Sequence, residues 1–160
     1  MNKKFYDVLV AYCTKNKIGL VKEDDNEFYF TPSKKQIHLG KEEIEDLESL
    51  YKAFHEASHS TAVLTGRNID NYALEEVVAD MTASNILSRI LHLFDTKEVD
   101  ENNYSEKLVR LKIMNTTYSS SWALRVLNDS KISYEDLMDY VKVEIQKNLE
   151  LFKDLIKEEK

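Results

Sequence analysis

The chain has 160 residues, of which 42% are apolar and 32% charged, a composition typical of one soluble globular domain. Its net charge of −7 disfavours a general electrostatic attraction to nucleic acid. Because Cys13 is the single cysteine, a disulfide framework and a thiolate metal cluster are both excluded. The early polar residues and the lack of a long apolar run predict a cytoplasmic protein with no membrane partner.

The first predicted elements are a helix and a small sheet. Apolar residues recur at helical spacing over residues 3–15. Three short β-prone runs follow at 18–21, 27–31 and 36–39, with polar stretches between them, and Pro32 marks the second turn. We therefore expect an α+β fold that begins with a helix and a small antiparallel sheet.

Helices are predicted for the rest of the chain. The first covers residues 41–64 and ends before Gly66. Asn68 or Asp70 can cap the next helix, which reaches residue 94, and its nearly encircling apolar residues predict a buried central position. A polar loop follows at about 95–103. Two further helices, at about 104–127 and 133–157, complete the chain.

These elements predict one domain over residues 1–160. Its parts are the N-terminal helix and sheet at 1–40, the pair of helices at 41–94 and the C-terminal helices at 95–160. The small sheet packed on the helix of residues 41–64, followed by a mostly helical part, is the layout of a minimal zincin.

The most informative motif is His-Glu-Ala-Ser-His at residues 55–59. Two histidines four residues apart lie on one face of a helix, so both can bind the same ion. Zinc accepts two neutral imidazoles and a carboxylate, with a fourth position left for water. The spacing therefore predicts His55 and His59 as zinc ligands and Glu56 as the carboxylate that activates water.

A second motif, Glu76-Val-Val-Ala-Asp80, can supply the third ligand. Asp80 lies one helical turn after Glu76, where it can orient His55 or His59 through the second ring nitrogen. Glu75 is the rival ligand, but the residue four positions after it is an alanine, so Glu76 is preferred.

Tyr72 and Tyr118 are candidates to contact the substrate or the transition state. Packing is the alternative role for Tyr118, and Trp122, four residues later, is interpreted first as a core residue. Two alternatives to a catalytic site stay open. The histidines can lie on a solvated helix face, or a zinc ion can serve folding alone, although structural zinc usually has four protein ligands.

Beyond its metal motif, the sequence resembles the metallopeptidase-like domain of the ArdC antirestriction family. That resemblance rests on four segments: 27–39, 50–61 with the His-Glu-Ala-Ser-His motif, 72–80 with the Glu76 motif, and 118–122, which reads Tyr-Ser-Ser-Ser-Trp. It implies a zincin-type fold, one zinc ion held at His55, His59 and Glu76, and Glu56 as the catalytic carboxylate. It also implies an origin in a phage, plasmid or conjugative element.

In that family an N-terminal domain is associated with single-stranded DNA binding, and residues 1–26 are too short to form one. The resemblance leaves nucleic-acid binding open, whereas the charge of −7 disfavours it. We therefore expect a zinc metallopeptidase with a protein or peptide substrate. The alternatives are an inactive zincin scaffold that inhibits a host defence protein by binding it, and a domain that zinc only stabilises.

Overall fold

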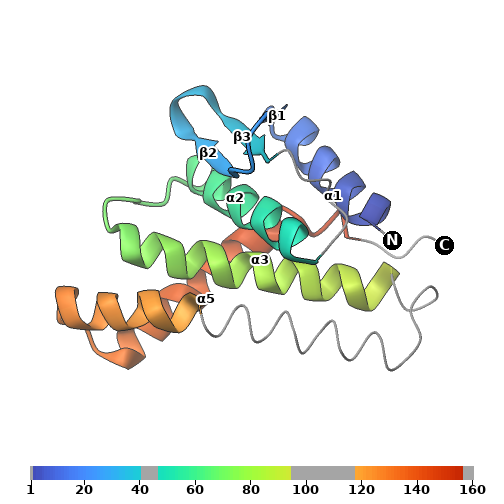
Figure 1. Ribbon diagram of the computed structural model, residues 1–160. Helices are drawn as coiled ribbons and strands as arrows, with labels where there is room; N and C mark the ends of the chain where they lie inside the picture. Colours follow the sequence, from blue (N-terminus) through green and yellow to red (C-terminus); the bar gives the residue numbers. More distant parts are fainter. Residues whose placement is uncertain (1, 41–46, 95–117, 157–160) are drawn as a thin grey trace.

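The computed structural model describes residues 2–40, 47–94 and 118–156 and has an α+β fold (Figure 1). Residues 118–130 are also helical. The other elements, in chain order, are α1 (Asn2–Lys15), β1 (Gly19–Lys22), β2 (Tyr29–Thr31), the 3-10 helix η1 (Pro32–Lys34), β3 (Gln36–Leu39), α2 (Leu47–Thr65), α3 (Tyr72–Phe94) and α5 (Tyr134–Glu150). The predicted helical residues 41–46 and 104–117 and the predicted loop at 95–103 lie outside the described residues.

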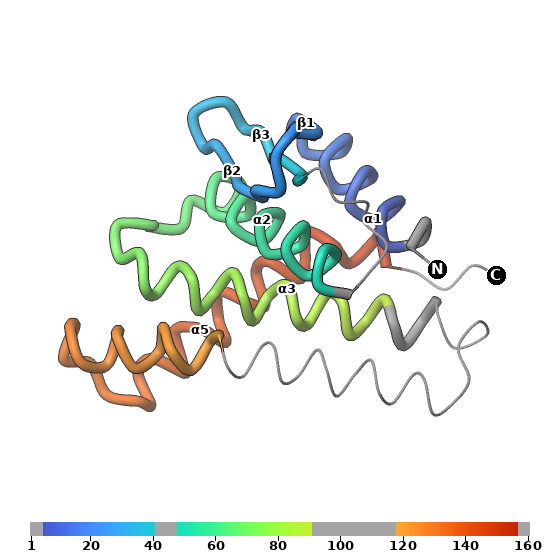
Figure 2. The backbone as a smooth tube through the Cα atoms, in the orientation of Figure 1, coloured from blue at the N-terminus to red at the C-terminus, as the bar shows by residue number. Residues whose placement is uncertain are grey.

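Helix α2 occupies the middle of the molecule. It packs against β2 and β3 on one side and against α3 on the other, while α5 contacts both helices (Figures 1 and 2). Its residues Leu50, Phe54 and Ala57 are fully buried. Because α2 packs against the sheet on one side and against α3 on the other, it can place side chains between these two elements.

Helix α3 is the buried central helix that its apolar residues predict. Val78, Ile86, Leu87 and Ile90 are all fully buried, which is the expected result for a helix without a wide polar face. Within the described ranges, no helix combines the length and the apolar composition that crossing a membrane requires.

The sheet is mixed, and the predicted antiparallel meander is wrong. Strand β3 lies in the centre; β2 pairs with it antiparallel, but β1 pairs with it in parallel. The β2–β3 hairpin is local and turns through Lys35, which has a positive φ of 50°. Strand β3 carries the buried Ile37 and Leu39, so it takes the central place and leaves the half-exposed β1 and β2 at the edges.

Two helix boundaries also differ from the prediction. The side chain of Asn71, rather than Asn68 or Asp70, accepts a hydrogen bond from the Leu74 N–H (3.1 Å) and caps α3. Helix α5 ends at Glu150 instead of near residue 157. Beyond it the chain forms turns that bring Phe152 into the core, where its ring stacks on Tyr12 at 4.2 Å.

Cys13 is expected to be chemically inert in the folded protein. The side chain is 3% exposed, and burial raises the pKa of its thiol to about 12. Since the thiolate is the reactive form, a disulfide reagent at pH 8 should label the native chain very slowly and the urea-unfolded chain fully. The labelling is measured by the absorbance change of the reagent. Rapid labelling of the native protein would contradict this packing of α1.

Candidate metal centre

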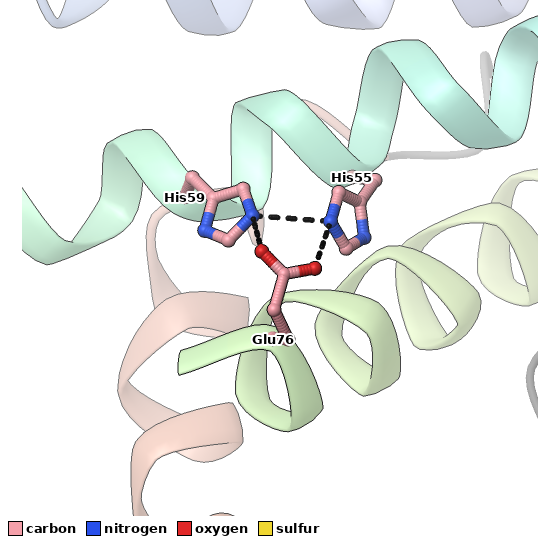
Figure 3. Close-up of side chains that lie close together, drawn as sticks. All are labelled: His55, His59 and Glu76. Carbon is pink, nitrogen blue, oxygen red and sulfur yellow. Dashed lines mark hydrogen bonds and ion pairs between the residues drawn. The ribbon is translucent and has the colours of Figure 1, made fainter. Parts of the chain in front are cut away.

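Three potential metal ligands meet between α2 and α3. The imidazoles of His55 and His59 point from α2 toward the Glu76 carboxylate on α3 (Figure 3). The distance between the two Nε2 atoms is 3.0 Å, His55 Nε2 lies 3.1 Å from Glu76 Oε2, and His59 Nε2 lies 3.0 Å from Glu76 Oε1. The structure thus brings together the three side chains that the sequence predicts as ligands.

These distances fit a small cation. Ligand atoms around a tetrahedral zinc ion with bonds of about 2.0–2.1 Å are separated by about 3.3–3.4 Å. Side-chain movements of a few tenths of an ångström would therefore accommodate the ion. His55 and Glu76 are buried and His59 is half-buried, and no other group of three or more His, Cys, Asp and Glu ligands occurs among the described residues.

The charges of the cluster also favour a cation. Burial alone would raise the pKa of Glu76, but its hydrogen bonds with His55 and His59 outweigh burial and hold this pKa well below its usual range. Burial also opposes protonation of His59, yet its hydrogen bonds with Glu75 and Glu76 raise the pKa of His59 to about 10. For His55 burial is the larger effect, and its pKa is lowered. One positive charge is thus stabilised between the three groups.

A carboxylate lies at the second ring nitrogen of each histidine. His55 Nδ1 is 3.7 Å from Asp80 Oδ1, and Ser119 donates a hydrogen bond from its hydroxyl to Asp80 Oδ2. Asp80 is fully buried and therefore fixed in position. The structure places Asp80 beside His55 rather than beside His59, one of the two positions that the sequence left open.

Glu75 lies at the second nitrogen of the other histidine. His59 Nδ1 is 3.1 Å from Glu75 Oε1, so Glu75 can orient His59 from the side opposite to Glu76. Arg67 donates two hydrogen bonds to the same carboxylate, from Nε at 2.8 Å and from Nη2 at 2.9 Å. Burial alone would raise the pKa of Glu75, but Arg67 and His59 outweigh burial and lower it.

The Arg67 guanidinium is the centre of a buried network that the sequence analysis did not find. Its Nη1 donates to Thr61 Oγ1 at 3.1 Å and to Asn148 Oδ1 at 2.9 Å, and its Nη2 donates to the Ser58 carbonyl at 3.3 Å. Asn148 in turn donates to Thr82 Oγ1 at 3.1 Å. The network joins α2, α3 and α5 directly behind His59.

Glu56 does not belong to the ligand cluster. It is half-buried and lines the space in front of the metal centre. Burial raises the pKa of its carboxyl to about 7, although the positive charge at His59 partly opposes this. A carboxylate in that range can both accept and release a proton near neutral pH.

Two hollows meet at this carboxylate. The larger, of about 860 Å³, extends along α2 toward Glu48, and the smaller, of about 350 Å³, extends toward Val63. Both are lined by Phe28, Glu56, Tyr72 and Glu76. The candidate metal centre therefore lies where the two hollows meet and is accessible from both.

The two candidate tyrosines lie on the wall of the cleft formed by α3 and residues 118–130. Tyr118 donates a hydrogen bond to Glu76 Oε2 at 2.7 Å, so its hydroxyl contacts a predicted ligand and is not merely packed. Tyr72 is 62% exposed and, like Phe28, lines both hollows. Trp122 is half-buried, packs against the core and contacts both tyrosine rings, at 5.2 Å and 6.2 Å.

No family model matches this chain, and neither a curated protein nor a solved structure matches it. The resemblance to the ArdC family, with the origin in a mobile element that it implies, therefore stays a prediction from the sequence motifs.

Proposed function

We propose that this protein is a zinc-dependent peptidase that uses water as the nucleophile. The observation that carries the proposal is the convergence of His55, His59 and Glu76, with ligand atoms 3.0–3.1 Å apart, at the floor of a cleft that Glu56 also lines. Two imidazoles and one carboxylate are a ligand set of catalytic zinc, whereas calcium and magnesium prefer oxygen ligands alone.

The number of ligands supports catalysis over a purely structural role. Within the described parts of the chain, the cluster contains three ligand side chains. Structural zinc sites usually have four protein ligands, and catalytic sites keep one position for water or substrate. Glu75 and Asp80 face the far nitrogens of the histidines, where they would orient the ligands instead of completing the coordination.

When bound, zinc lowers the pKa of water and polarises a carbonyl group. Glu56 then has the role of general base: it accepts a proton from water as the water oxygen bonds to the carbonyl carbon. The same carboxyl donates this proton to the amide nitrogen as the C–N bond breaks. The products are a carboxylate and an amine, with no covalent intermediate on the protein.

In the proposed mechanism, the tyrosines hold the reacting groups in place. Tyr118 already donates to Glu76 and so restrains the orientation of that carboxylate. Tyr72 is exposed in the cleft, and its hydroxyl, which interacts with the Glu76 carboxylate, can turn from there toward a substrate carbonyl oxygen. Its ring rests edge-on against Trp122 at 5.2 Å, which limits the positions that it can take.

The dimensions of the cleft favour a polypeptide substrate. Residues of α2 line the two hollows from Glu48 to Val63, a distance of about 22 Å along the helix axis. An extended chain rises about 3.3 Å per residue, so about six or seven substrate residues would span this floor. The edge strand β2 borders the smaller hollow, in the position from which an extended peptide can pair with a sheet.

Removal and return of the metal test the proposal. A library of unlabelled peptides, with cleavage detected by mass spectrometry, should be cut by the protein as purified with zinc. Cleavage should stop after treatment with a chelator and return when one equivalent of zinc is added. Zinc binding without cleavage of any peptide would favour the inactive binding module, and cleavage that survives metal removal would contradict the proposal.

A further inference from the structure

The two hollows on either side of Glu56 differ in size, about 860 Å³ for the larger and about 350 Å³ for the smaller. Aromatic rings line both, and Phe28 and Tyr72 are shared. Tyr51 and Tyr118 lie only in the larger, whereas Tyr29, Phe30, Val63 and Ile69 lie only in the smaller. Tyr51 contributes its ring rather than a polar contact, because its hydroxyl oxygen is buried away from the surface of the hollow. The larger hollow is thus suited to a bulky, flat apolar group.

The charges of the larger hollow disfavour an ionised occupant. A negative side chain would meet the carboxylates of Glu48 and Glu56. The position for a positive group is already taken: the Lys52 ammonium lies 3.6 Å from Glu48 and 5.9 Å from the centre of the Phe28 ring. Aromatic rings and carboxylates attract a cation, and Lys52 already provides one in this hollow. A positively charged group of a ligand would therefore gain less by binding there.

Exposed apolar side chains surround the cleft. Tyr29, Val63, Ile69, Tyr72 and Tyr118 are each at least 39% exposed, and all of them line one hollow or both. Exposed apolar groups gathered around one cleft mark a surface that an apolar partner covers. A ligand that fills only the larger hollow would leave Val63 and Ile69 in water, whereas an occupant that extends along the whole cleft would cover them as well.

We propose that the cleft selects an extended polypeptide segment with a large neutral apolar side chain, preferably aromatic, which enters the larger hollow next to the peptide bond held at Glu56. This inference rests on the proposed peptidase function and deepens it by naming the substrate class. It assigns Phe28, Tyr51 and Lys52 as specificity-determining residues and predicts weak binding of segments with an acidic residue at this position.

Binding and cleavage can be measured on the same peptides. Four eight-residue peptides would differ at one central position, with Phe, Ala, Arg or Glu. Their affinities are measured with the zinc-loaded Glu56→Gln protein through the fluorescence of Trp122, the single tryptophan, which contacts Tyr72 and Tyr118 at the cleft. The Phe peptide should bind on the order of 10- to 100-fold more tightly than the Ala peptide, and the Arg and Glu peptides should bind more weakly than Phe.

Matched variants identify the hollow that is responsible. Ser121 is exposed and lines the larger hollow, so Ser121→Phe should fill it and reduce the preference for Phe over Ala to less than about threefold. Val63→Phe adds a ring to the smaller hollow instead and should leave this preference unchanged. Lys52→Ala should strengthen binding of the Arg peptide relative to the Phe peptide, and Tyr51→Phe should keep the preference for Phe.

The outcomes separate this inference from the peptidase proposal. Selective binding of the Phe peptide without cleavage by the wild-type protein would support the cleft and reject the peptidase. Equal cleavage of all four peptides would reject the selectivity and keep the peptidase. A preference for Phe that persists in Ser121→Phe, or binding of none of the peptides, would overturn the inference.

Discussion

A Glu56→Gln protein should lose peptide hydrolysis and keep its zinc. The amide has nearly the shape of the carboxyl group but cannot accept a proton from water, so kcat/KM should fall by about 10²- to 10⁴-fold, the usual contribution of a general base. Glu56 is half-buried and is not one of the three clustered ligands, so the substitution leaves the metal-binding atoms in place. Zinc content and kcat/KM are measured on the same preparation.

A His59→Gln protein is the matched comparison, because it removes a ligand from the same face of α2 one turn away. It should lose both the metal and the hydrolysis. The account would be contradicted by a Glu56→Gln protein that cleaves peptide at the wild-type rate, or by a His59→Gln protein that binds zinc as tightly as the wild type.

The second large effect is expected at Arg67. Arg67→Met should lower the free energy of unfolding by about 3–5 kcal/mol, because it removes the guanidinium partner of the buried Glu75 carboxylate and leaves it with His59 alone. It should also weaken zinc binding by about 10- to 100-fold, since Glu75 would no longer be held against His59 Nδ1. Urea unfolding of the metal-free protein and competition with a zinc indicator measure the two effects separately.

Arg89→Met provides the control. Arg89 lies on α3 and is exposed, and its replacement removes the same charge as Arg67→Met. The free energy of unfolding should therefore change by less than about 0.5 kcal/mol, and the zinc affinity should stay the same. Equal effects at positions 67 and 89 would show that the Arg67 network does not support the metal centre.

The ligand cluster was predictable because it depends on local geometry. An i, i+4 pair of histidines must lie on one helix face, and the carboxylate needs only a second helix packed against the first. The orienting role of Glu75 was not predictable in the same way. Adjacent residues on a helix point in directions about 100° apart, so the roles of Glu75 and Glu76 are decided by the rotation of α3 against α2.

The long-range contacts could not be predicted from the sequence. Arg67 follows the helix-ending Gly66 with no motif around it, and its partner Asn148 is 81 residues away. The three strands were located to within about two residues by their β-prone runs, but the parallel pairing of β1 with β3 was missed. Strand pairing depends on which strand is most buried, and no local spacing encodes that choice.

The most direct test is a crystal structure of the protein purified without chelator, with anomalous scattering recorded on both sides of the zinc absorption edge. The account predicts one zinc ion bonded to His55 Nε2, His59 Nε2 and a Glu76 carboxylate oxygen, with a water facing the cleft. Absence of a peak between α2 and α3, or a fourth protein ligand that closes the coordination sphere, would contradict it.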